Sequence, residues 1–252
     1  MYRPTSIRTR ELPIDIADIS EEELCQLVTS RSSDEAWGIV VTPNMHHIAQ
    51  LEVGSPIDAA YQIAQVVVAD GWPVVRLARR LGNPLRGRTT GSGLVSLVSN
   101  CVVDGRRAFI IGGSTESSGR MLAEKMRANG WLTAIDYFPV GSFGSADAHD
   151  RLFRAVERFE PDLVIVGIGT PRQEMLAVEI SSLRGNGWIL CVGAGVDYAA
   201  GARSRSPIIF QRLGLEWMYR IVREPNRLLL RYLRDVPPFV AVARRSTSGR
   251  SK

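Results

Sequence analysis

Asp162-Leu-Val-Ile-Val-Gly167 is a short apolar run bounded by an acidic residue and a glycine, which is typical of a strand buried on both faces of a sheet. A helix-like segment follows from about Gln173 to Leu183, and a second apolar run, Trp188-Ile-Leu-Cys-Val-Gly193, comes next. Strand, helix and strand at this spacing indicate a parallel unit, because parallel neighbours need a long crossover between them.

The same alternation continues toward the N-terminus of the 252-residue chain. It predicts an α/β fold with a mainly parallel, Rossmann-like sheet and helices on both faces. Further strands are expected at Trp37–Thr42, Arg107–Gly112 and Leu132–Tyr137, with a short one that ends at Asp70. Further helices are expected at Ile57–Val68, before that short strand, at about Ser117–Asn129 and at Ala146–Arg158.

Positive charge is concentrated in the last fifty residues. Residues 203–252 contain twelve Arg and Lys against three Asp and Glu, a balance of +9, while the whole chain carries +5. We therefore expect a Rossmann-like core over residues 1–202 and a basic helical appendage over 203–252, disordered from about residue 244. Seven residues follow one another at steps of three or four among bulky apolar residues: Arg212, Glu216, Arg220, Arg223, Arg227, Arg231 and Arg234. They predict an amphipathic helix suited to an anionic membrane surface or to diphosphate groups.

Composition limits the other possibilities. The three cysteines are scattered and form no CxxC pair, so they indicate a reducing compartment and no disulfide framework. No run reaches the ~18 apolar residues of a membrane span, and the N-terminus lacks the apolar run of a signal peptide. We therefore expect a cytoplasmic protein with peripheral contact to the inner face of the membrane. A nucleic-acid partner is not expected, because the positive charge lies almost wholly in the tail and no nucleic-acid-binding motif is present.

Candidate site residues follow the strands, because ligands in open α/β sheets bind beyond the carboxyl ends of the strands. Gly112, Gly113 and Ser114 open a helix after a strand, which suits a phosphate group, although a tight turn capped by a hydroxyl residue is an equally good interpretation. The pairs Gly167-x-Gly169 and Gly193-x-Gly195 lack the third glycine of a dinucleotide fingerprint, so we expect them to admit a flat ligand or another backbone.

Several side chains at the same edge could carry chemistry. Asp70 follows a short apolar run and precedes a glycine, so it is placed for general-base catalysis, with a turn or helix cap as the alternative. Gln173 offers a donor and an acceptor to a sugar or base, or simply begins a helix. His46 and His47 form no metal-ligand motif and are expected to cap a helix or lie at the surface. The chain also has no Asp-x-Asp pair for a divalent metal.

Five short blocks of sequence occur in the order found in one known family. They are Val41-Thr-Pro-Asn44, Asp70-Gly71, Arg88-x-Thr90-Gly91, Gly167-Ile-Gly-Thr-Pro-Arg-Gln-Glu174 and Gly193-Ala-Gly-Val-Asp197. After them come Arg212-Leu-Gly-Leu-Glu-Trp-Met-Tyr-Arg220, Glu224-Pro225-x-Arg227 and Arg231-Tyr-Leu. From about Trp37 to Leu233 the chain thereby resembles the TagA/WecG/CpsF family of bacterial cell-surface glycosyltransferases.

The resemblance implies an inverting transfer of a sugar from a UDP-sugar donor to an undecaprenyl-diphosphate-linked acceptor, in the assembly of exopolysaccharide, capsule or teichoic-acid-type polymers. Asp70 would take the proton of the acceptor hydroxyl, and Arg88 would stabilise the leaving diphosphate. Because arginine matches phosphate oxygens with a permanent charge, no metal or other cofactor is expected. Homologous cores tend to self-associate, so a homo-oligomer is a further expectation. Of the remaining residues, Thr42 and Asn44 would line the pocket, Gln173 would contact the donor or acceptor, and Arg220 and Arg227 would close over the site.

The sequence departs from the family pattern at three positions. Gly93 stands where Thr-Gly-x-Asp supplies a carboxylate, Pro73 replaces a second glycine after Asp70, and His46 replaces an acidic or small residue. These changes bear on the donor sugar and on the acceptor site. Two other classes of protein stay open. The missing glycines count against a nucleotide-dependent Rossmann-like oxidoreductase, and the polar residues after the strands count against a non-catalytic membrane adaptor.

Overall fold

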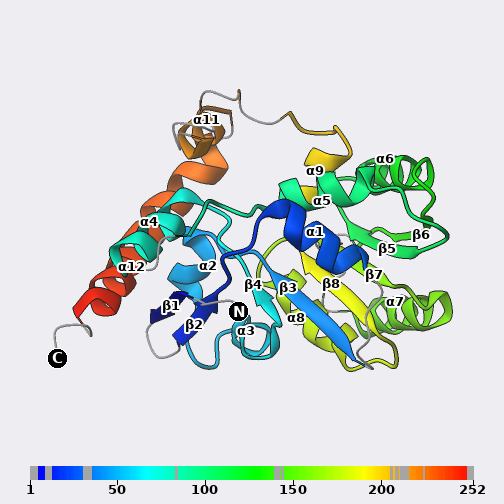
Figure 1. Ribbon diagram of the computed structural model, residues 1–252, viewed down its shortest axis with the longest axis horizontal. Helices are drawn as coiled ribbons and strands as arrows, with labels where there is room; N and C mark the ends of the chain where they lie inside the picture. Colours follow the sequence, from blue (N-terminus) through cyan, green and yellow to red (C-terminus); the bar gives the residue numbers. More distant parts are fainter. Residues whose placement is uncertain are drawn as a thin grey trace.

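The computed structural model describes residues 5–8, 13–30, 36–82, 85–138, 143, 145–204, 207, 210, 216–223 and 225–248. Six parallel strands form one sheet in the order β4-β3-β8-β7-β5-β6 (Figure 1). An antiparallel hairpin, β1-β2, lies beside β4 at one edge of this sheet. The strands are β1 (Thr5–Arg8), β2 (Pro13–Ile16), β3 (Trp37–Val41), β4 (Val66–Val67), β5 (Arg107–Gly112), β6 (Leu132–Asp136), β7 (Leu163–Gly167) and β8 (Gly187–Cys191).

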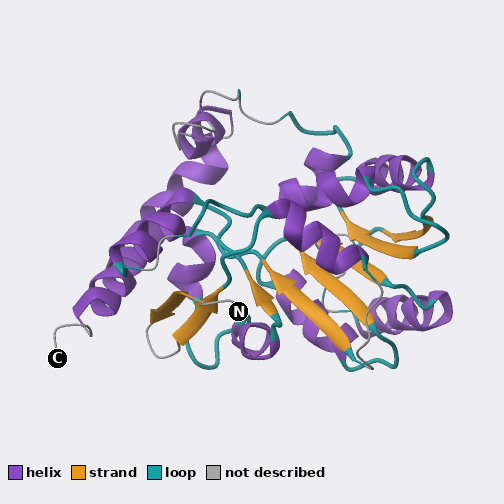
Figure 2. Ribbon diagram, in the orientation of Figure 1, coloured by secondary structure: helices purple, strands orange, loops and turns teal. Residues whose placement is uncertain are grey.

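Alternate strand residues face two separate cores, one on each side of the sheet. In β7, Leu163 and Ile165 pack into one core while Val164 and Val166 pack into the other, and all four are fully buried. Helices cover both cores (Figure 2), which confirms the predicted α/β fold with a mainly parallel sheet. The first core is covered by α1 (Glu21–Thr29), α5 (Gly91–Asn100), α6 (Glu116–Arg127) and α9 (Gly195–Ala199). The second is covered by α2 (Met45–Gln50), α3 (Asp58–Ile63), α4 (Trp72–Arg80), α7 (Ala146–Phe159) and α8 (Arg172–Ser181).

Several elements near the carboxyl edge of the sheet were not predicted from the sequence pattern. They are the β1-β2 hairpin and the helices α1, α2, α4 and α5. α2 has six residues, too few to show a helical period, and α5 is rich in glycine and serine. α1 does carry a recognisable start signal, because Ser20 and Glu23 form a reciprocal capping box.

The C-terminal appendage consists of α11 (Glu216–Arg223) and α12 (Pro225–Ser248), and α12 packs along α2 and contacts β1 (Figure 1). Val242 is buried in the second core, and Ser246, one turn later, is buried as well. The predicted disorder from residue 244 is therefore wrong for residues 244–248, because packing against the core orders the end of the helix. Residues 249–252 lie outside the described residues. Among the helices that the structure describes, none combines the length and apolar character needed to cross a membrane.

Candidate active site

A pocket of about 580 Å³ lies between the carboxyl edge of the sheet and the appendage. The residues after β3 and β4 and the loop before α5 form one wall, and α11 and α12 form the other. Three residues predicted for the site, Asn44, Asp70 and Arg88, therefore line one cavity. The rest of its lining is mainly apolar and aromatic, and His46, Arg231 and Asp235 add polar side chains. The other residues that line it are Met45, Gly71, Trp72, Pro73, Ile221, Leu229, Tyr232, Leu233, Val236 and Pro237.

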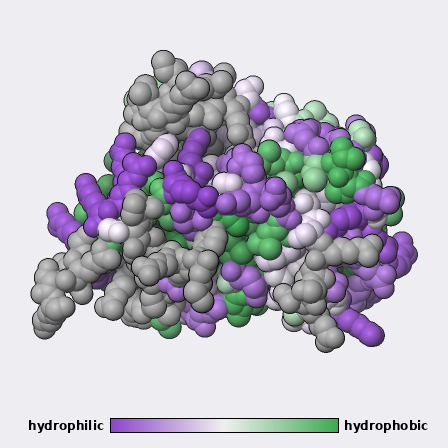
Figure 3. All heavy atoms as spheres, in the orientation of Figure 1, coloured by the Kyte–Doolittle hydropathy of each residue, from purple (hydrophilic) through white to green (hydrophobic). Residues whose placement is uncertain are grey.

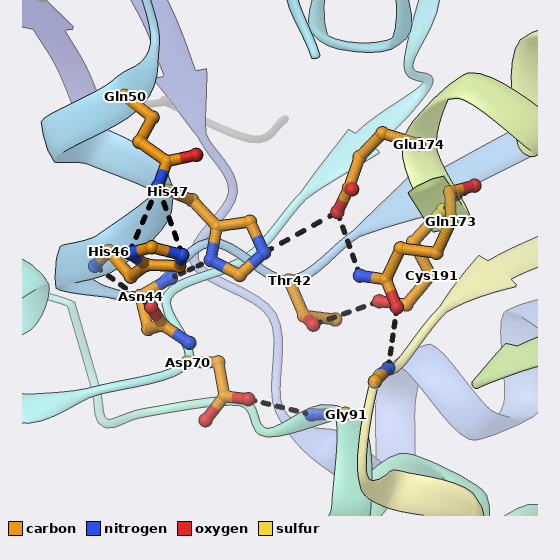
Figure 4. A network of polar contacts seen from close by, with 11 residues as sticks. Thr42, Asn44, His46, His47, Gln50, Asp70, Gly91, Gln173, Glu174 and Cys191 are labelled. Atoms are coloured by element: carbon orange, nitrogen blue, oxygen red, sulfur yellow. Dashed lines mark hydrogen bonds and ion pairs between the residues drawn. The ribbon is translucent and has the colours of Figure 1, made fainter. Parts of the chain in front are cut away.

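Backbone contacts at the ends of two neighbouring strands position Asn44 and Asp70. Asn44 caps α2, and its Oδ1 accepts a hydrogen bond from the His46 N–H at 2.9 Å. The Asp70 N–H donates to Pro43 O at 2.9 Å, which ties the exit of β4 to the exit of β3. In Figure 4 the amide of Asn44 points toward Asp70. The sheet thus places an amide and a carboxylate side by side in the pocket.

The first turn of α5 meets the Asp70 carboxylate. Asp70 Oδ2 accepts from the Gly91 N–H at 3.4 Å, a long hydrogen bond (Figure 4). This N–H is one of the unpaired donors at the start of the ten-residue helix, where the helix dipole adds partial positive charge. The carboxylate of Asp70 is therefore held at the start of α5 by a backbone donor.

Thr42 supports the pocket from behind and does not line it. Its side chain is buried, and its hydroxyl donates to Cys191 O at 3.0 Å, which joins the ends of β3 and β8. We therefore revise the expectation that Thr42 lines the pocket, and assign it to holding the strand ends in register.

A buried network of polar side chains runs behind the pocket from α2 to the turn after β8 (Figure 4). The Asn44 N–H donates to His47 Nδ1 at 3.3 Å, and His47 Nε2 lies 3.4 Å from Glu174 Oε1. Gln173 Nε2 donates to the same Glu174 oxygen at 2.7 Å, while Gln173 Oε1 accepts from the Gly193 N–H at 2.8 Å. Gln173 is 2% exposed and both ends of its amide have partners in the protein, so we now assign it a positioning role in place of the expected ligand contact.

Replacing Glu174 with glutamine is expected to lower the free energy of unfolding by about 1–3 kcal/mol at neutral pH, because it removes the charged member of this buried network. Burial opposes ionisation of Glu174, but the hydrogen bonds from His47 and Gln173 outweigh it, so the pKa of this carboxyl is lowered. A lowered folded-state pKa stabilises the protein above the unfolded pKa, and this contribution is lost as the pH falls through the folded value. In urea unfolding, the difference in the free energy of unfolding between wild type and Glu174→Gln should therefore shrink from neutral to strongly acidic pH.

Glu179→Gln is the matched control for this measurement, since Glu179 also pairs with a histidine, His149, but its side chain is 40% exposed. Its deficit should be smaller at neutral pH, as expected for a partly solvated pair. A deficit of Glu174→Gln that stayed constant across the pH range would show that the lowered pKa is not what stabilises the network.

The turn after β5 is already occupied by a carboxylate of the protein. The N–H and the hydroxyl of Ser114 both donate to Asp197 Oδ1 at 2.8 Å, and Asp197 is 4% exposed. Arg203 Nε lies 3.7 Å from the other Asp197 oxygen. Both donors of Ser114 are thus used within the protein, which favours the alternative interpretation of a structural turn, and the phosphate contact of Ser114 stays a prediction.

The glycines after β7 and β8 allow segments of the chain to approach one another. A side chain at Gly167 would collide with Val196, and one at Gly195 would press on the backbone of Gly91 at about 3.1 Å. At Gly167 and Gly195 the close neighbours are other segments of the protein, so these glycines admit a neighbouring segment and not a flat ligand.

Gly113 and Gly169 lie in the turns after β5 and β7 with positive φ angles. Gly112 lines a separate pocket of about 300 Å³ with Glu116, Gly119, Ile135, Asp136 and Tyr137.

Arg220 and Arg227 lie on α11 and α12, but their side chains are outside the described part of the chain, so their predicted closure over the site stays a prediction. Arg231 lies in the pocket wall and was not selected from the sequence as a site residue. The signal was present, because Arg231 belongs to the same stripe of arginines at helical spacing.

Glu21 on α1 fills the place left by Gly93, where the related pattern has an aspartate. Glu21 Oε1 accepts from the Thr90 N–H at 2.9 Å and from the Thr90 hydroxyl at 2.6 Å. Its carboxylate occupies the space that a side chain at Gly93 would need. A carboxylate is thus present at the start of α5, supplied from 69 residues earlier in the chain.

Within the described residues, no group of three or more His, Cys, Asp or Glu side chains is placed to hold a metal ion. Metal independence remains a prediction. Comparison with protein families gives one further finding: the family model described as "Glycosyl transferase WecG/TagA/CpsF family" matches residues 9–252 of this chain.

Proposed function

This chain belongs to the WecG/TagA/CpsF family of glycosyltransferases, and from that premise we propose that it moves a sugar from a UDP-sugar to a lipid-diphosphate-linked sugar with inversion. The observation that carries the proposal is the shared pocket of Asp70 and Arg88, with the basic appendage as its second wall. A base and a fixed positive charge in one cavity are the two groups that a direct displacement needs.

In the proposed reaction, the acceptor hydroxyl enters the pocket beside Asp70. An Asp70 carboxylate oxygen takes the hydroxyl proton as the acceptor oxygen attacks the anomeric carbon of the donor sugar. The bond between that carbon and the diphosphate oxygen breaks, and UDP leaves with the electron pair. Arg88, on the same pocket wall, stabilises the negative charge that develops on the leaving diphosphate. Asn44, next to Asp70, can donate to or accept from a sugar hydroxyl.

We place the donor phosphates at Arg88 and not at the turn after β5. Ser114 has already donated both its N–H and its hydroxyl to Asp197, so this turn has little capacity left for a second anion. Arg231, on the opposite wall, adds a second permanent positive charge to the same cavity. Two guanidinium groups facing one pocket suit a reaction in which both donor and acceptor carry a diphosphate.

Docking of the appendage on an anionic membrane surface would bring the lipid-linked acceptor to the pocket. On α11 and α12, Val222 and Leu230 are 75% and 71% exposed, and Leu233 is 63% exposed. Arg234 and Arg245 are exposed on the same appendage. Apolar insertion and attraction at ~1 kcal/mol per basic residue would together give reversible binding at the cytoplasmic face.

Family membership favours a transferase over the oxidoreductase considered from the sequence, and the pocket with its paired base and arginine favours an enzyme over a non-catalytic adaptor. The donor nucleotide can be tested directly. UDP at about 100 times its Kd should stabilise the folded protein by about 2.7 kcal/mol, which for a chain of this size corresponds to a rise in Tm of roughly 5–10 °C.

The measurement is a thermal-shift series with UDP, UDP-sugars, NAD and NADP, each with and without EDTA. Stabilisation by UDP that survives EDTA supports a metal-independent UDP site. Stabilisation by NAD with no response to UDP would overturn the proposed function.

A further inference from the structure

A contact between α2 and α12 fastens the appendage to the core at the rim of the pocket. His46 Nδ1 lies 2.6 Å from Asp235 Oδ2, although the two residues are 189 positions apart in the chain. Gln50 Nε2 lies 3.0 Å from the other ring nitrogen of His46. Both His46 and Asp235 line the pocket that holds Asp70. The two walls of the cavity are thus joined beside the proposed base.

The contact is a buried hydrogen bond with a defined direction. The side chains of His46 and Asp235 are 13% and 4% exposed. A carboxylate accepts hydrogen bonds, so Nδ1 carries the hydrogen that meets Asp235, while the Gln50 amide nitrogen lies 3.2 and 3.0 Å from the two ring nitrogens. Burial lowers the pKa of His46, and the nearby Asp235 carboxylate opposes this shift without reversing it.

This bond can set the register of α12 on α2. A helix shifted along α2 would separate Asp235 from His46 and leave this buried carboxylate only the exposed Arg234 of its own helix, whose Nε lies 3.7 Å away. Burying a carboxylate with so little compensation is costly. Apolar neighbours such as Val236 could pack in several registers at similar cost, whereas the His46 N–H group offers one position. A buried polar contact can select one packing arrangement even where it adds little stability.

The same histidine also takes part in the pocket wall of the core. Its backbone N–H donates to Asn44 Oδ1, and Asn44 lies next to Asp70 (Figure 4). On the other side, Tyr232 and Val236 flank Asp235 on α12 and line the cavity. A single contact therefore relates the position of the appendage wall to the position of the Asn44–Asp70 wall.

We propose that His46 and Asp235 are a positioning pair, which fixes the register of α12 on α2 and so completes the acceptor side of the pocket. The assignment of this side to the acceptor rests on the proposed function. The placement of α12 by the pair does not, and it can be measured without turnover.

The test uses full-length Asp235→Ala and Asp235→Asn proteins, with hydrogen–deuterium exchange of residues 225–248 and steady-state kinetics with a lipid-diphosphate-linked acceptor. Asp235→Ala should speed exchange in α12 by about tenfold, as expected for the loss of one charge-assisted hydrogen bond, and should raise the acceptor KM by a similar factor. Asp235→Asn keeps a carbonyl that can accept from Nδ1, so its α12 exchange and its acceptor KM should be close to those of the wild type. The thermal shift given by UDP should be the same in all three proteins.

His149→Gln is the matched control, because His149 makes a similar bond of 2.8 Å to Glu179 between α7 and α8, and neither residue lines the pocket. It should leave α12 exchange and the acceptor KM unchanged. His46→Ala combined with Asp235→Ala should cost no more than the worse single variant, since the two act through one bond.

Unchanged α12 exchange in Asp235→Ala, or losses that multiply in the double variant, would overturn the positioning pair. Wild-type protein that binds no UDP and transfers no sugar would instead contradict the proposed function, and the exchange data would still decide whether the pair places α12.

Discussion

Asp70→Asn is expected to abolish sugar transfer while UDP binding persists. Asparagine keeps the size of the side chain and can still accept from the Gly91 N–H, but it cannot take the proton of an acceptor hydroxyl. A positioned general base contributes about 10²–10⁴-fold to rate, so kcat should fall by at least about 100-fold. The measurement pairs a transfer assay on the lipid-linked acceptor with the UDP thermal shift.

Asp104→Asn serves as the control, because Asp104 is exposed in the loop between α5 and β5 and lies outside the pocket. It should retain wild-type turnover. Turnover close to wild type in Asp70→Asn would remove Asp70 from the role of base. Loss of the UDP thermal shift together with turnover would point to a binding or folding defect.

Membrane binding is expected to fall at least about tenfold when Val222 and Leu230 are both replaced by glutamate. These residues are highly exposed on α11 and α12 and do not line the pocket, so their replacement should leave the fold and the cavity intact. Burying one such side chain in an apolar phase contributes about 1.5–3 kcal/mol, and two acidic groups would in addition be repelled by an anionic surface. Co-sedimentation with anionic liposomes measures the change, and activity on a membrane-embedded acceptor should fall with it.

The control is a variant in which Val102 and Met121, two exposed apolar residues outside the appendage, are replaced by glutamate. It should bind liposomes as the wild type does. Met121 lies on α6, over which Figure 3 shows a hydrophobic area, so it tests whether any exposed apolar surface suffices. Equal losses in the two double variants would refute the appendage as the membrane-binding surface. Deletion after residue 202 is a less clean experiment, because it would also remove Val242 from the core.

The fold was largely predictable because a central parallel strand is buried on both faces and so must be apolar along its whole length. β7 and β8 carry that signature without interruption. Short helices that depend on tertiary packing, such as α2, lack a signature of comparable length. The ordered end of α12 was missed for a related reason, since the composition of residues 244–248 does not show that Val242 and Ser246 are buried.

The candidate site was predictable in part. Asp70 and Asn44 follow neighbouring strands, so the rule that ligands bind at the carboxyl edge selects them together. Gln173 and Ser114 follow strands too, and their residue types suit a ligand equally well. Their partners, however, lie in other segments: the amide of Gln173 meets Glu174 and Gly193, and Ser114 meets Asp197, 83 positions away.

The sequence by itself determined the parallel sheet, the edge at which chemistry can occur, and the basic appendage, because each follows from residue type and local spacing. The tertiary structure alone decided which polar groups line the pocket and which lie behind it in contact with distant segments. It brought Asp235 to His46 and Glu21 to Thr90 across 189 and 69 positions. The physical reason is that a hydrogen-bonding group has a limited number of partners, and whether a distant segment already provides them depends on how the chain packs.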